Sequence, residues 1–245
     1  MRPFLAARRG TTMSAVRLYG FPLSTYVNVA RLVLTHKGVP YDFHDLEPDM
    51  GGPRHLALHP FNRVPILEHG DFLLYETAAI IAYVDDAFPG PKLTPSDLKL
   101  RARMNQWISN LSAYYYPYIA FHLGHERIVY PALGVAPDEK VVAAALPRIR
   151  TALDVMEREL QHGREFLITS EPTLADYALL PCMTTLSMTP EGADMLMSRN
   201  LIMRWRSRME ALPAAIHVRA EVAPHVAMPV EHARTWVNSH RPYYR

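Results

Sequence analysis

The chain has 245 residues, 49% of them hydrophobic and 20% charged, which is enough to build apolar cores in one large domain or two small ones. Its 26 Lys and Arg residues nearly balance its 24 Asp and Glu residues. The resulting net charge of +2 gives little long-range attraction for nucleic acid or an anionic membrane, because such binding depends on clustered cations. We therefore expect a small molecule or a protein as the partner, and neither nucleic acid nor membrane.

The single cysteine, Cys182, excludes an internal disulfide framework and a zinc site made of several cysteines. We expect no metal, although the 12 histidines leave a site of His and carboxylate ligands formally open. The longest apolar stretch, residues 78–84, is far shorter than the roughly 20 residues of a membrane-spanning helix. Nothing requires an oxidising compartment, so we expect a cytoplasmic protein. Residues 1–14 are interpreted as a disordered extension, with a start at Met13 or an organelle transit peptide as alternatives.

Residues 15–88 alternate strand and helix signals. In chain order these are a strand over 16–19, a helix over 25–37, a strand over 39–46, an irregular connection over 47–63, an antiparallel hairpin over 64–75 and a helix over 76–88. Because a helix separates the first two strands, we expect them to pair in parallel. This order predicts a small mixed sheet with helices on its faces.

A proline-rich linker over 89–96 separates this domain from residues 97–221, where strand signals nearly vanish. Apolar residues at helical spacing predict four helices there, around Met104–Tyr115, Val142–Leu160, Thr173–Met188 and Asn200–Leu212. The third begins with a capping box, in which Thr173 and Asp176 bond each other's backbone N–H. We expect an all-helical second domain, followed by a basic, aromatic tail over 222–245 that lies on the surface or is disordered.

Three short motifs of the first domain carry polar or backbone groups that can bind a ligand. Val64-Pro65 opens the hairpin, and a cis bond there would turn the backbone groups of Val64 outward toward an extended peptide, whereas a trans bond would be merely structural. Glu76 and Thr77 begin a helix, where they can hold both charges of an amino-acid head group or simply cap the helix. Ser24 precedes the first helix, as an N-cap or as a hydroxyl facing a ligand.

The run from Val64 to Pro89, the linker and the capping box together resemble the cytosolic glutathione transferases over roughly residues 16–221. The resemblance implies an α/β thioredoxin-like N-terminal domain and an all-α C-terminal domain, assembled as a homodimer. It implies detoxifying transfer of glutathione, the co-substrate, to a hydrophobic electrophile. Peroxidase activity on the same site, a glutathione-dependent isomerase or dehalogenase, and a non-catalytic binding or interaction module are the alternatives.

The resemblance also implies roles for individual residues. Pro65 matches the family's cis-proline, with Val64 binding the cysteinyl part of glutathione and Arg63 near the tripeptide, and Glu76 and Thr77 match the pair that holds the γ-glutamyl group. The catalytic hydroxyl of serine-type classes (phi, tau, theta) falls on Ser24. The tyrosine-type position falls on Gly20, and Cys182 is far from this loop. Thr25 is the nearest competitor of Ser24, ahead of Tyr26 and Tyr19.

The electrophile is expected against the long helix after the linker. Tyr114, Tyr115 and Tyr118 are predicted to line its pocket, with Tyr116 as a further candidate, although four neighbouring tyrosines cannot all face one pocket. One departure concerns the glycine end of glutathione, where phi-type members carry a basic pair. This chain has Met50-Gly51-Gly52 there, and Arg54 or His55 is the possible substitute.

Overall fold

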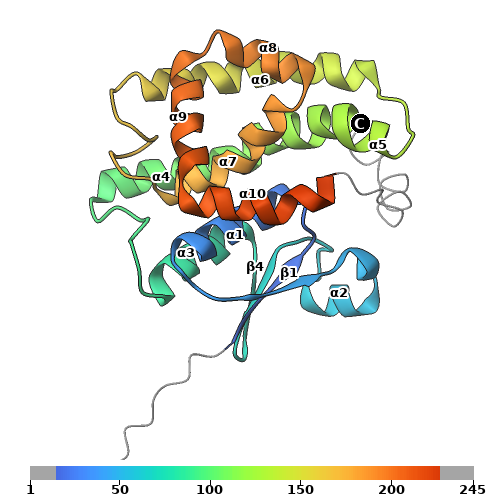
Figure 1. Cartoon of the computed structure of the whole chain (residues 1–245), viewed down its shortest axis with the longest axis vertical. Helices are drawn as coiled ribbons and strands as arrows, with labels where there is room; N and C mark the ends of the chain where they lie inside the picture. Colours follow the sequence, from blue (N-terminus) through green and yellow to red (C-terminus); the bar gives the residue numbers. More distant parts are fainter. Residues whose placement is uncertain (1–14, 227–245) are drawn as a thin grey trace, which may run out of the picture.

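The computed structural model describes residues 15–226, so the predicted extension over 1–14 and residues 227–245 of the tail lie outside the described residues. A sheet with its helices forms the lower part of the molecule in Figure 1, and a larger group of helices lies above it. The strands are β1 (Val16–Gly20), β2 (Asp42–Asp45), β3 (Ile66–His69) and β4 (Phe72–Tyr75). Within the described residues they form a sheet of order β2-β1-β3-β4. The α/β thioredoxin-like fold and the all-helical domain are confirmed.

The pairing of the strands follows the predicted pattern. β1 runs parallel to β2 and antiparallel to β3, and β3 and β4 form the hairpin through Gly70, whose φ of 65° suits glycine. β2 is shorter than the predicted strand over 39–46, because residues 39–41, which include Pro40, lie outside the ladder.

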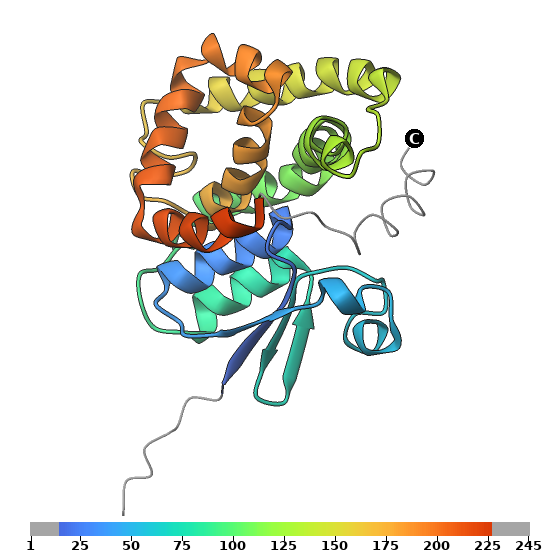
Figure 2. The same cartoon turned by 45° about the vertical axis from the view of Figure 1, so that its right-hand side comes forward.

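The helices of this domain are α1 (Thr25–His36), η1 (Glu47–Asp49), α2 (Pro53–Leu58) and α3 (Thr77–Ala87). α1 and α3 lie between the sheet and the helical domain, whereas α2 projects to one side of the strands (Figure 2). The expectation of a purely irregular connection over 47–63 was wrong. Pro53 stands at the first position of α2, where its missing N–H costs nothing, and the residues after it favour a helix.

The second domain contains the four predicted helices and more. Its elements are α4 (Leu98–Asn110), η2 (Leu111–Val129), α5 (Tyr130–Ala132), α6 (Glu139–Leu160), α7 (Leu174–Ser187), α8 (Pro190–Met197), α9 (Asn200–Ala211) and α10 (Pro213–Val226). η2 is a π-helix that continues α4 in one long rod. α10 runs to Val226, so the first residues of the predicted tail are helical.

A buried ion pair fastens the end of α1 to the end of α3 and to the linker. Lys37 Nζ lies 3.2 Å from Asp85 Oδ1 and 3.1 Å from the carbonyl oxygen of Pro91, and both charged side chains are fully buried. Asp85 also accepts the backbone N–H groups of Leu93 and Thr94, each at 3.0 Å. Every charge and carboxylate oxygen of this junction therefore has a partner.

The predicted capping box of α7 is present and buried. Asp176 Oδ2 accepts the backbone N–H of Thr173 at 2.8 Å, and Oδ1 accepts the indole N–H of Trp205 at the same distance. Burial raises the pKa of Asp176 although its hydrogen bonds oppose the shift. The box thus ties the start of α7 to α9 as well as capping the helix.

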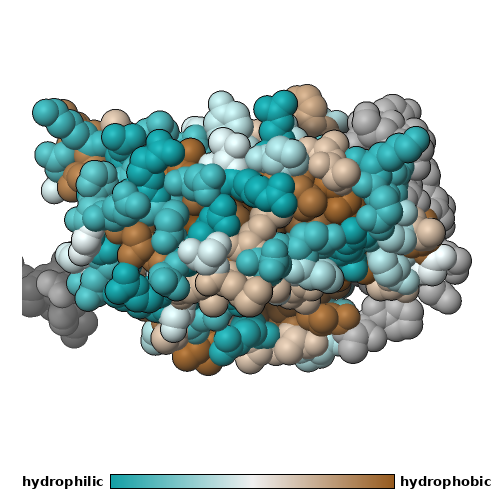
Figure 3. Space-filling model, turned by 90° about the horizontal axis from the view of Figure 1, so that it is seen from above, coloured by the Kyte–Doolittle hydropathy of each residue, from teal (hydrophilic) through white to brown (hydrophobic). Residues whose placement is uncertain are grey.

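The surface of the helical end is largely hydrophilic, with apolar side chains in small groups between charged ones (Figure 3). Among residues 15–226, no helix has the length and the apolar character needed to span a membrane. The same residues hold no group of three or more His, Cys, Asp or Glu side chains suited to a metal ion.

Candidate active site

The sheet register brings three segments together at one end of the sheet. Tyr19 pairs with Ile66, and Ile66 pairs with Tyr75, so the end of β1, the beginning of β3 and the end of β4 lie side by side. The predicted site residues that adjoin these strand ends are Ser24, Val64, Pro65, Glu76 and Thr77. Segments far apart in the sequence therefore converge where the resemblance places the glutathione site.

The Val64–Pro65 peptide bond is cis, as the resemblance implies. Val64 precedes β3, and within residues 15–226 neither its backbone N–H nor its C=O makes a hydrogen bond. A donor and an acceptor on one residue can pair with the backbone of a short extended peptide, as an added strand does.

Glu76 stands between β4 and α3 with φ 72° and ψ 115°, a conformation that residues other than glycine rarely adopt. Its side chain makes no capping hydrogen bond to α3, and the residue is exposed. The capping alternative therefore does not describe Glu76. A strained, exposed residue at a helix N-terminus whose carboxylate makes no hydrogen bond to residues 15–226 is typical of a ligand site, and the buried Thr77 begins the helix next to it.

Ser24 is the N-cap of α1 and is 9% exposed. Its Oγ accepts the backbone N–H of Val27 at 3.4 Å. This bond uses a lone pair of the oxygen and leaves the hydroxyl proton available, so capping and donation to a ligand are compatible. Thr25 follows as the first residue of α1.

Two tyrosines near Ser24 have other surroundings. The hydroxyl of Tyr19 donates to Glu68 at 2.7 Å, along the sheet. The Tyr26 hydroxyl donates to Ser112 Oγ at 3.3 Å, and its ring lies 4.4 Å from that of Tyr116. Burial raises the pKa of Tyr26 to about 12, and the charge of Glu76 acts in the same direction. The Tyr26 side chain is thus neutral and lies between the sheet end and η2.

The tyrosines of η2 differ in their positions. Tyr115 is 1% exposed and donates its hydroxyl to the carbonyl of Ala152 at 2.7 Å, so its prediction as a pocket residue was wrong. Burial raises its pKa as well. Tyr114 is largely exposed and Tyr118 is half-buried beside His122, which leaves both as predictions. Tyr116 packs against Tyr26, which lies two residues after Ser24, and it too stays a prediction.

The proposed substitutes for the basic pair have other roles. The His55 ring is fully buried and bonds the backbone of Gly51 and Arg63, so it is not exposed to a ligand carboxylate. The exposed Arg54 lies 3.3 Å from Asp49. Arg63, exposed just before Val64, stays a prediction as a neighbour of the tripeptide.

His59 is a site neighbour that sequence reasoning missed. It is 1% exposed, packs on the ring of Tyr75 at 4.5 Å, and accepts the backbone N–H of Phe61 at 3.3 Å. Burial lowers its pKa, whereas the charge of Glu76 opposes this shift. The only signal in the sequence is its spacing of four residues from His55, which places both on one face of α2 and its end.

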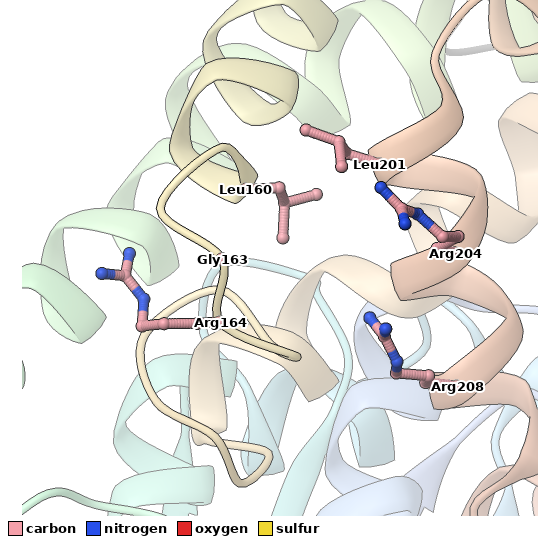
Figure 4. A pocket seen from close by; sticks show the side chains of 6 residues that line it. All are labelled: Leu160, Gly163, Arg164, Leu201, Arg204 and Arg208. Carbon is pink, nitrogen blue, oxygen red and sulfur yellow. The ribbon is translucent and has the colours of Figure 1, made fainter.

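A separate cavity of about 110 Å³ lies in the helical domain, between α9 and the loop after α6 (Figure 4). Arg204 and Arg208 point into it from α9, and Arg164 points away. The cavity includes none of the residues at the sheet end.

Comparison with known proteins identifies the family. Residues 18–92 match the family model "Glutathione S-transferase, N-terminal domain", and residues 112–213 match "Glutathione S-transferase, C-terminal domain". The chain belongs to the glutathione S-transferase family. Glutathione S-transferase 3 of Zea mays is 33% identical over 209 residues, which cover 82% of this chain and 92% of that protein. A probable glutathione S-transferase of Oryza sativa subsp. japonica is 31% identical and is covered over 99% of its length, with 86% of this chain.

Solved structures of the family agree with this assignment. The apo form of glutathione S-transferase III superposes with a TM-score of 0.78 at 31% identity, over 85% of this chain and 97% of that one. Glutathione S-transferase I, solved with lactoylglutathione, has a TM-score of 0.76 at 26% identity, over 84% of this chain and 99% of that one. The chain is therefore an enzyme of the glutathione transferase type, with glutathione as its co-substrate.

Proposed function

We propose that this transferase binds glutathione along Val64, activates its thiol at Ser24 and adds it to a hydrophobic electrophile bound against η2. The observation that carries the proposal is a set of polar groups at one end of the sheet that are available to a ligand within the described residues 15–226. These are the backbone of Val64, the carboxylate of Glu76 and the hydroxyl proton of Ser24. Glu76 would hold the ammonium of the γ-glutamyl group, and the N-terminus of α3 with Thr77 would hold its carboxylate.

The thiol supplies the chemistry. A free thiol has a pKa of about 8.5, so only a few per cent is thiolate at neutral pH, and the thiolate is the nucleophile. A hydrogen bond from the Ser24 hydroxyl and the N-terminus of α1 both favour the charged sulfur. A shift of two pKa units corresponds to about 2.7 kcal/mol of differential stabilisation. The thiol proton passes to water, and the thiolate sulfur then forms a bond to the electrophilic carbon. In a substitution the leaving group departs from that carbon with its electron pair, and in an addition a π bond opens and the neighbouring atom takes a proton from water. Ser24 remains a donor throughout.

The decisive experiment compares Ser24→Gly with Thr25→Ala. Glycine is tolerated as an N-cap at a cost of only a few tenths of a kcal/mol, so Ser24→Gly removes the hydroxyl and spares the helix. We expect Ser24→Gly to bind glutathione by calorimetry but to conjugate a general aromatic electrophile up to about 100-fold more slowly at neutral pH, as the thiol pKa rises. Thr25→Ala should conjugate at the wild-type rate.

Other outcomes lead to other assignments. A large loss in Thr25→Ala alone would move the donor role to Thr25. A wild-type protein that binds no glutathione at millimolar concentration would instead be a non-catalytic binding or interaction module. The observations behind this alternative are the pairing of Arg54 with Asp49 and the burial of His55, because neither side chain is placed to replace the missing basic pair.

We also propose that the protein is a cytoplasmic homodimer. β4 is an edge strand of the sheet, and its Phe72 and Leu73 are 44% and 39% exposed. Proteins commonly cover or protect an apolar edge strand, and a second copy would do so. Light scattering on the purified protein measures the mass directly, and a monomer at micromolar concentration would contradict this proposal.

A further inference from the structure

The buried ring of His55 has a defined hydrogen-bond arrangement. The backbone N–H of Gly51 donates to Nδ1 at 3.2 Å, and Nε2 lies 2.9 Å from the carbonyl oxygen of Arg63. Because an amide N–H can only donate, Nδ1 is the acceptor, and because a carbonyl can only accept, Nε2 carries the proton. Both nitrogens of a neutral imidazole are therefore used, and one ring joins two loops.

The Arg63 carbonyl belongs to the same peptide group as the N–H of Val64. That group is planar, and the cis bond in this segment is the next one, Val64–Pro65. In a trans peptide group the C=O and the N–H point in opposite directions. Holding the Arg63 oxygen therefore also sets the direction of the Val64 N–H, a donor that bonds no acceptor among residues 15–226.

A second effect acts through the same peptide group. A hydrogen bond accepted by a carbonyl polarises the group and strengthens the bond that its N–H donates. The other partner of the ring, Gly51, lies in the loop where the basic pair of phi-type members would stand, and its φ of 77° suits glycine. His55 thus fixes this loop relative to the Val64 edge.

We propose that His55 is a positioning residue for glutathione: it orients the Val64 N–H toward the cysteinyl carbonyl of the tripeptide and holds the Gly51 loop beside it. This inference rests on the proposed function. His55 touches the backbone behind the site and stays out of contact with the ligand, since its ring is fully buried.

The test compares His55→Phe with His55→Gln. Phenylalanine keeps an aromatic ring and loses both hydrogen bonds, so the Gly51 N–H and the Arg63 C=O lose the partner that orients them. We expect the glutathione Kd, measured by calorimetry, to rise about tenfold, and the KM for glutathione to rise with it, while kcat at saturating glutathione stays near the wild-type value. In His55→Gln the side-chain amide can donate to the Arg63 carbonyl, so Kd should return most of the way to wild type.

His36→Phe is the matched control, because His36 Nδ1 also lies in a short bond, 2.7 Å from the Tyr177 hydroxyl, but far from the Val64 edge in the fold. It should lower the melting temperature and leave the glutathione Kd unchanged. A His55→Phe protein that binds glutathione like the wild type overturns this inference alone. A wild-type protein without glutathione binding overturns the proposed function and the inference together. If His55→Phe does not fold, either of two other results overturns the inference. These are a glutathione Kd in His55→Ala equal to that of the wild type, and a Kd in His55→Gln that stays far above the wild-type value.

Discussion

The junction around Lys37 and the sheet end around Val64 treat polar groups in opposite ways. At the junction, Lys37 and Asp85 are fully buried, and each carboxylate oxygen accepts a backbone N–H. At the sheet end, the backbone of Val64 and the carboxylate of Glu76 make no hydrogen bond to residues 15–226, and Glu76 has a strained backbone. The polar groups of the first region satisfy one another, whereas under the proposed function those of the second are satisfied by glutathione.

The difference teaches how to separate stability from function in this chain. Substitutions at the junction should lower the free energy of unfolding and leave the activity of the folded molecules unchanged. Substitutions at the sheet end should change binding and leave stability equal or improved, because strained sites commonly sacrifice stability for function.

The largest effect is expected from Asp85→Ala. This change leaves Lys37 as an uncompensated buried charge, which costs about 3–5 kcal/mol of the free energy of unfolding. Chemical denaturation measures this loss, and the glutathione Kd of the folded fraction should not change. A loss below about 1 kcal/mol, typical of an exposed pair, would contradict the description of this junction.

Acid denaturation provides the control for Asp85. Burial raises the pKa of Asp85, but the hydrogen bonds from Leu93, Thr94 and Lys37 outweigh it, and the pKa lies below its ordinary value. A carboxyl with a lowered pKa contributes stability that is present above its unfolded pKa and is lost as the pH falls through its folded pKa. The wild type should lose this contribution in acid, and Asp85→Ala should lack that part of the pH dependence.

The next effect is expected at Glu76, where function and stability should move in opposite directions. Glu76→Gly removes the carboxylate and relieves a φ of 72°, so the glutathione Kd should rise tenfold or more, while the free energy of unfolding increases by about 1 kcal/mol. Calorimetry and denaturation measure the two quantities. Glu76→Gln, the control, keeps the strained backbone and should show the loss of affinity without the gain in stability.

The smallest effect is expected from Tyr115→Phe. Its buried hydroxyl bonds Ala152, and losing this bond should cost about 1 kcal/mol of stability without changing the conjugation rate. Tyr116→Ala is the variant to compare with it, and we expect its KM for the electrophile to change severalfold. A rate change in Tyr115→Phe alone would show that the core tyrosine takes part in catalysis after all.

The sequence predicted those parts of the fold that depend on neighbouring residues. The helix predicted over 25–37 is α1, followed by Gly38 with a φ of 67°, and Thr173 and Asp176 form their box, because each feature needs only residues within one turn. The short helix α2 was missed because its apolar residues are too few to show a period.

The tyrosines expected to line the electrophile pocket were predicted only in part, because the local pattern does not reveal which type of helix η2 forms. Tyr115 and Tyr118 share a face in an α-helix, but η2 has π-helical hydrogen bonds, which shift the faces on which neighbouring residues lie. The contact of Tyr116 with Phe121, five residues later, reflects this change. The role of His55 depends on a loop eight residues away, which no local pattern reveals.

The position of α10 has a consequence for synthesis on the ribosome. Arg31 of α1 is nearly buried and bonds Glu221 of α10 at 2.6 Å, so the last described helix covers part of the first one (Figure 1). A chain made from its amino end leaves this flank of α1 uncovered until residue 226 has emerged from the exit tunnel. Nascent chains that stop before α10 would therefore carry an exposed surface of the kind that chaperones recognise.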